Sequence, residues 1–203
     1  SGIEPTAWPL PHGIRQVVLR RLGRLDDASR QLLGLAAVVG STIDAGMLFQ
    51  VSGWKEEDFL EASNELLRRQ LLIEGDAQLH FTHEQIRQAV YRGIDPGQRR
   101  ELHRRVGTIL EQHAPERVEE LAYHFFRGQM PERAVPCCLQ AGEHAFAIYA
   151  SSAALTYFGQ AISAARRLKR NAARPAILRA HEQRAQLLEH LGEYQQAVAE
   201  DAA

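Results

Sequence analysis

Apolar side chains recur at helical spacing along most of this 203-residue chain, the pattern of helices that bury one face. In the first half, the pattern predicts helices at 14–22, 26–39, 44–51 and 56–70. Short β-prone runs at 71–74 and 78–81 then flank Gly75, which predicts a hairpin. A helix from His83 to Gly93 follows. Helices followed by a hairpin are the order of a winged helix, which we place at residues 14–95.

Two segments flank this predicted domain. Three prolines make residues 1–13 an extended lead-in, because the proline ring restricts the backbone. On the other side, Asp95-Pro96 supplies a capping carboxylate and a proline suited to the first helical position. We therefore predict a connecting helix at 96–112.

Residues 113–203 are predicted to form an α-solenoid, because small-residue-rich helical segments follow one another with brief turns. The predicted helices span 116–127, 131–149, 152–170, 175–191 and 194 to the end. Ala154, Phe158 and Ala161 follow the order of small and aromatic positions in a tetratricopeptide (TPR) unit. Ala154 recurs as Ala197, 43 positions later, whereas the standard TPR period is about 34 residues. We therefore describe the repeats as TPR-like, and the uncapped pattern at the end predicts that they continue.

The expected fold class is thus mostly α, and composition adds some limits to its function. The chain carries 24 basic and 25 acidic side chains, a net charge of −1, so no global field attracts it to nucleic acid or an anionic membrane. Its two cysteines, Cys137 and Cys138, are adjacent and cannot form an ordinary disulfide, which fits the cytosol. No apolar run approaches the roughly 20 residues that cross a bilayer. We expect a cytoplasmic protein without membrane contact.

The motifs of common catalytic sites are missing from the sequence. It contains no G-x-x-x-x-G-K-[ST], G-x-G-x-x-G or G-x-S-x-G, so we assign no catalytic residue and expect this chain not to be an enzyme. His83-Glu84 could begin a zinc-binding H-E-x-x-H, but the fifth position is Arg87, so no metal is expected. Cys137 has no base nearby in the sequence, and both cysteines are predicted to be small buried side chains.

A winged helix suggests DNA binding, but the local charge disfavours it. Between Asp44 and Asp76 there are eight acidic and three basic side chains. Glu57, Glu61 and Glu65 lie four positions apart and predict one acidic ridge on the helix that would read DNA. Such a ridge repels phosphates, so direct DNA binding is not expected.

The candidate site lies where the hairpin meets the next helix. Thr82 is predicted to cap that helix with Gln85 reaching back, as in a capping box. His83 and Glu84 would then occupy the first turn, where unpaired amides and the positive end of the helix dipole favour phosphates. The alternative is that His83 only caps or packs the start of the helix.

Several stretches of the sequence carry a family resemblance. They are Leu10 to Arg15, Leu32 to Gly40, Glu65 to Leu72, Phe81 to Arg87 with Tyr91, Arg99 to His103, and Leu121 to Phe125. Together they resemble the STAND signalling NTPases, whose bacterial members include large transcriptional regulators. In that family an AAA-type nucleotide-binding domain precedes a winged helix and a superhelical repeat arm. The resemblance implies that this chain is the winged helix and the beginning of the arm.

The resemblance also implies a role for His83. In related ATPases a Met-His-Asp motif at this place puts its histidine against the β-phosphate of ADP. The corresponding triplet here is Thr82-His83-Glu84, so two of the three residues differ and only His83 carries over. The resemblance therefore implies that His83 contacts ADP in the intact parent, while this chain alone binds no cofactor.

The leading hypothesis is a non-catalytic regulatory and protein-interaction module of a nucleotide-switched signalling ATPase or transcriptional regulator. It would hold the ADP state and relay a signal from the repeat arm, with ADP and ATP bound by the parent. Its expected partners are the parent's own nucleotide-binding domain and a signal protein, peptide or small inducer on the arm. Two alternatives stay open: a DNA-binding winged-helix regulator, and a TPR scaffold that binds a peptide without nucleotide linkage.

Overall fold

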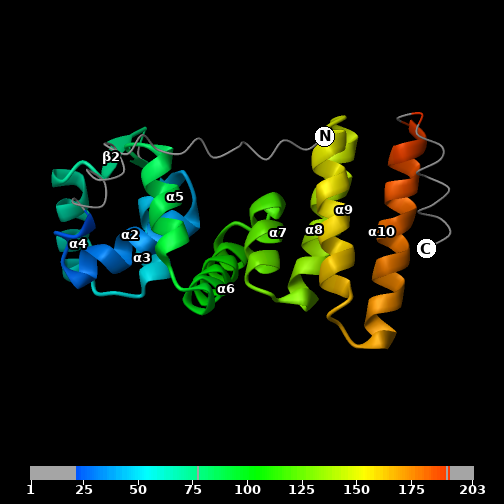
Figure 1. Cartoon of the computed structure of the whole chain (residues 1–203), viewed down its shortest axis with the longest axis horizontal. Helices are drawn as coiled ribbons and strands as arrows, with labels where there is room; N and C mark the ends of the chain where they lie inside the picture. The colour runs from blue at the N-terminus through cyan, green and yellow to red at the C-terminus, as the bar shows by residue number, and fades with distance from the viewer. Residues whose placement is uncertain (1–21, 77, 191, 193–203) are drawn as a thin grey trace. The chain divides into compact units, whose positions relative to one another are not determined.

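The computed structural model describes residues 22–76, 78–190 and 192, and Figure 1 labels its helices and strands. The chain forms two compact units, the first ending at Ile109 and the second beginning at Leu110. The division falls inside helix α6 (Pro96–His113), which matches the predicted connecting helix to within one residue. The described chain is mostly helical with one small sheet, which confirms that the fold is mostly α, as predicted.

The first unit contains the helices predicted from residue 26 onward and the predicted hairpin. Its elements are α2 (Asp27–Val39), β1 (Thr42–Asp44), α3 (Ala45–Ser52), α4 (Glu56–Arg68), β2 (Leu72–Gly75), β3 (Gln78–Phe81), α5 (Glu84–Gly93) and most of α6. The helix predicted at 14–22 falls almost wholly outside the described residues.

Three aspartates start helices in this unit. The carboxylate of Asp26 accepts a hydrogen bond from the amide of Ser29 at 2.7 Å, and that of Asp44 accepts one from the amide of Met47 at 2.6 Å. Asp95 accepts the amide of Gly97 at 2.8 Å, next to Pro96 at the first helical position. Each bond satisfies an amide that the helix itself leaves unpaired, which contributes about 1 kcal/mol. The predicted starts of α2, α3 and α6 are therefore confirmed.

The sheet has one strand more than predicted. Its order is β1-β3-β2, and both pairings are antiparallel. The hairpin of β2 and β3 was predicted, but β1 was not: Ile43 pairs with Leu79 across 36 positions of sequence. The side chain of Ile43 is fully buried, so β1 anchors the sheet to the helices.

One core holds the first unit together. Leu32 and Leu33 of α2 belong to a cluster of buried side chains to which every other element contributes, including Leu48 of α3, Leu66 of α4 and Ile86 of α5. Complete burial of each such side chain contributes about 1.5–3 kcal/mol. Leu60 of α4 lies outside this core, because it is 49% exposed.

The second unit consists of packed helices. They are the end of α6, α7 (Val118–Arg127), α8 (Pro131–Ala147), α9 (Ser151–Ala165) and α10 (Arg170–His190). The largest errors in the predicted bounds are five residues: α9 ends at Ala165 instead of 170, and α10 begins at Arg170 instead of 175. The helix predicted from residue 194 lies outside the described residues.

Helices α8 and α9 lie side by side, as Figure 1 shows. A stripe of small residues along α8 is buried throughout, at Ala134, Cys138, Ala141 and Ala145. Opposite it, Phe158 of α9 is also fully buried. Its ring lies so close to Gly142 that a Cβ on this glycine would be 2.4 Å from Phe158 Cε1. The small residues therefore set the close approach of the two helices.

Candidate functional site

His83 is the residue between β3 and α5. Its backbone is extended (φ −145°, ψ 135°), and its carbonyl accepts the amide of Ile86 at 2.9 Å. The residue is exposed, and its side chain forms no capping hydrogen bond. The imidazole is thus accessible at the positive end of a ten-residue helix.

The predicted capping box at this junction is wrong. His83, not Thr82, is the capping residue, so His83 lies just before the first turn of α5. The hydroxyl of Thr82 instead donates to the carbonyl of Gln70 at 2.6 Å, and the amide of Thr82 donates to the carbonyl of Leu71 at 3.2 Å. Both bonds reach back to the turn before β2, so they fix the strand end rather than the helix start.

Arg87 ties the first turn of α5 to another helix. Its Nε donates to the two carboxylate oxygens of Glu84 at 3.0 and 2.9 Å, and its Nη1 donates to the carbonyl of Ala37 in α2 at 3.2 Å. The guanidinium also lowers the pKa of Glu84 below its usual range, because it stabilises the charged carboxylate. Sequence reasoning did not predict the ion pair of Arg87 with Glu84, although the spacing of three positions is that of a helical ion pair.

This arrangement can receive an anion. The charge of Glu84 is balanced by Arg87, so the start of α5 carries the helix dipole and an accessible imidazole without a dominant negative charge. An imidazole there can donate to a phosphate oxygen. The junction thus supplies hydrogen-bond donors, which is the chemistry of an anion-binding site.

Metal and thiol chemistry find no support in the described parts. No three histidine, cysteine, aspartate or glutamate side chains within them come together as metal ligands. Burial raises the pKa of Cys138 to about 12, and burial also raises the pKa of Cys137. Such thiols are protonated at neutral pH and are weak nucleophiles.

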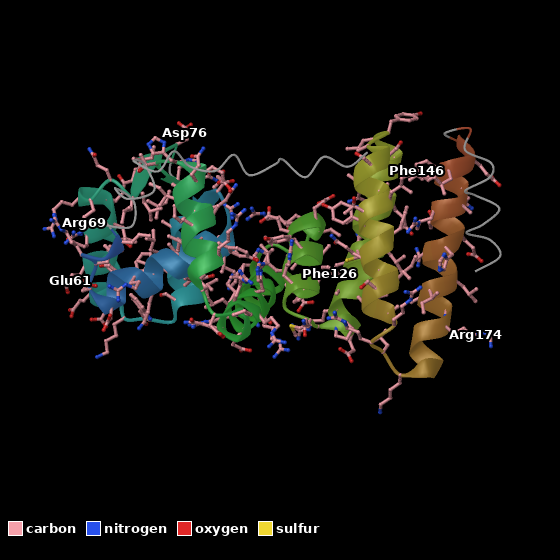
Figure 2. All side chains as sticks on the ribbon, in the orientation of Figure 1. Glu61, Arg69, Asp76, Phe126, Phe146 and Arg174 are labelled. Atoms are coloured by element: carbon pink, nitrogen blue, oxygen red, sulfur yellow. The ribbon has the colours of Figure 1, made fainter. Side chains whose placement is uncertain are left out.

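The acidic ridge of α4 is shorter than predicted. Glu57 and Glu61 are exposed, and Figure 2 labels Glu61 on this helix. Glu65 is only 11% exposed and pairs with Arg68 and Arg69. The exposed acidic groups are therefore concentrated in the first half of α4, which still leaves that half unsuited to a phosphate backbone.

None of the helices in the described part of the chain is both long and apolar enough to span a bilayer.

Comparisons with known proteins identify no relative of this chain. No protein-family model, curated protein or solved structure matches the chain.

Proposed function

We propose that the chain is a non-catalytic regulatory module of a nucleotide-switched signalling protein of the STAND class, and that His83 contacts ADP bound by the parent's nucleotide-binding domain. The observation that carries this proposal is the accessible imidazole of His83 at the start of α5, where no side chain forms a capping hydrogen bond. The surrounding bonds from Thr82 and Arg87 hold its backbone to two other parts of the first unit. A fixed donor of this kind can favour one nucleotide state over another.

The order of elements supports the assignment of the first unit to the winged-helix class. A strand precedes α3, and the hairpin β2–β3 adds to that strand on the side of β3. In the second unit, the small and aromatic positions Ala154, Phe158 and Ala161 are all buried, as a TPR-like helix pair requires. The exposed acidic half of α4 favours docking on a protein domain over direct DNA reading.

Replacing His83 by alanine in the intact parent tests the nucleotide contact. A hydrogen bond to a charged group contributes about 1.5–3 kcal/mol, so ADP should dissociate about 10- to 100-fold faster from the variant. The measurement is the release of bound ADP, followed with a fluorescent ADP analogue. His80→Ala is the matched control, because it removes an imidazole from β3, three positions before the junction. Unchanged ADP release in His83→Ala would defeat the assignment.

A further inference from the structure

A cavity of about 530 Å³ lies between α2, α5 and α6 in the first unit. Sites that bind small molecules commonly have volumes of about 300–1,000 Å³. Small residues line this space on two helices that pack against each other (Figure 1): Gly34 lies on α2, and Ala89 and Gly93 lie on α5. A Cβ on Gly93 would meet no atom within 4 Å. The two helices therefore pack together without filling the space between them and α6.

The wall of the cavity is mostly apolar. Its described lining includes Leu33, Leu35, Trp54, Val90, Ile94 and Leu102. The backbone amide of Trp54 donates to Ser52 Oγ at 3.2 Å, which holds this residue just after α3. Apolar surface that a ligand buries against such a wall contributes about 25 cal/mol for each Å². The cavity therefore suits the apolar body of a ligand.

Arg105 of α6 adds a positive charge to the rim of the cavity. Its side chain is exposed, and its Nη2 lies where a Cβ on Gly53 would collide with it. Among the described residues, Arg105 has no hydrogen-bond or ion-pair partner. Arg30, the other arginine of the lining, instead pairs with Asp27 at 3.0 Å and donates to the carbonyl of Leu25 at 2.8 Å. The charge of Arg105 is thus available to an anion.

We propose that this cavity binds a small amphipathic carboxylate, with its apolar body against the lining and its carboxylate on Arg105. The described lining contains two arginines and no acidic residue, so it favours an anionic head group. A guanidinium can also donate to both oxygens of a carboxylate. This inference does not rest on the proposed nucleotide contact.

A neighbouring groove makes the charge of the head group the decisive property. This second groove shares Trp54 with the cavity, and its lining includes the carboxylates of Asp26, Asp58 and Glu61. A ligand with its head group in that groove would have to be a cation. The proposal therefore requires that an anion binds more tightly than a cation with the same apolar body.

Three ligands with the same octyl chain test this requirement. Octanoate, 1-octanol and octylamine are titrated into the 203-residue chain at low salt and neutral pH, and Trp54 reports binding by its emission in a Trp8→Phe background. Octanoate should bind about 3- to 10-fold more tightly than 1-octanol, because an ion pair at an exposed rim contributes modestly. Octylamine should bind most weakly. Equal affinities, tightest binding of octylamine, or no saturable response to octanoate would each overturn the proposal.

Arg105→Met isolates the contribution of the guanidinium, because methionine retains an apolar side chain and removes the charge. Octanoate should then bind as weakly as 1-octanol, whereas the affinity for 1-octanol should not change. Arg104→Met is the matched control, since Arg104 is exposed on the same helix, pairs with Glu101 at 3.4 Å and lies outside the described lining. A preference for octanoate that survives Arg105→Met, or that Arg104→Met removes equally, counts against the proposal.

Gly34→Leu tests whether the ligand occupies the cavity itself. Gly34 is buried, and a Cβ there would make an ordinary contact with Ile94, 3.8 Å from its Cδ1. The larger side chain should fill part of the cavity and weaken the binding of octanoate and 1-octanol alike, by at least about tenfold. If this variant loses its far-UV circular dichroism, Gly34→Ala replaces it, with a weakening of about twofold expected. Unchanged affinity for both ligands in the folded variant overturns the proposal.

Discussion

Replacing Gly142 by alanine tests the close approach of α8 and α9. A Cβ at this position would lie 2.4 Å from Phe158 Cε1 and 2.7 Å from Phe158 Cδ1. The ring is fully buried, so it cannot move into solvent. Overpacking of this kind costs about 1–3 kcal/mol, whereas alanine in a helix interior is favoured over glycine by about 1 kcal/mol. The free energy of unfolding should therefore fall by about 1 kcal/mol.

Gly159→Ala is the matched control on the facing helix. A Cβ there has its nearest neighbour at 3.6 Å, Nη1 of Arg184, which is the end of a flexible side chain. Only the helix preference remains, so this substitution should stabilise the unit by up to about 1 kcal/mol. The two glycines should thus respond with opposite signs, although both lie inside helices.

Hydrogen exchange of peptides from α8 and α9 measures how each substitution changes the local stability of these two helices. The expected difference of about 1–2 kcal/mol between the two variants corresponds to about 5- to 30-fold in exchange rate, if exchange follows the opening equilibrium. A Phe158→Leu background should reduce the cost of Gly142→Ala, because the crowded ring is gone. Equal stabilisation by the two alanines would refute the packing argument.

Three further outcomes are expected from the structure. Tyr149 has a left-handed backbone (φ 61°) and is 91% exposed, so Tyr149→Gly should stabilise the second unit by up to about 1 kcal/mol in urea unfolding; an unchanged midpoint would show that the backbone is not strained there. The lowered pKa of Glu84 means that its ion pair with Arg87 stabilises the fold above the carboxyl's usual pKa of 4.5 and is lost as the pH falls through the folded value. Glu84→Gln should therefore reduce the acid-dependent loss of the melting temperature below that pH, and an identical pH profile would contradict this contribution. Fluorescence anisotropy with duplex DNA at low salt should detect no more than weak binding, whereas tight binding that weakens steeply with salt would favour the DNA-binding alternative.

The sequence predicted the helix starts because each capping aspartate lies within three residues of the amide whose hydrogen bond it accepts. Asp26, Asp44 and Asp95 are examples, and the hairpin around Gly75 is equally local. Strand β1 was missed because its three residues acquire a partner only when β3 folds onto them.

At the candidate site, sequence reasoning placed His83 at the junction of β3 and α5 but assigned the wrong cap. Thr82 has a suitable neighbour in Gln85, yet its hydroxyl bonds to Gln70, 12 positions earlier in the sequence. The bond from Arg87 to Ala37 spans 50 positions. Neither partner could be predicted, because a backbone carbonyl leaves no side-chain signature.

The two main-chain acceptors at Gln70 and Ala37 have a consequence for evolution. Any amino acid at positions 37 and 70 offers the same carbonyl oxygen, so the two bonds make no demand on the side chains there, whereas positions 82 and 87 must retain a donor. Substitutions at the two ends of each bond will then not be correlated. Methods that infer proximity from correlated substitutions should therefore miss both hydrogen bonds, even with thousands of aligned sequences.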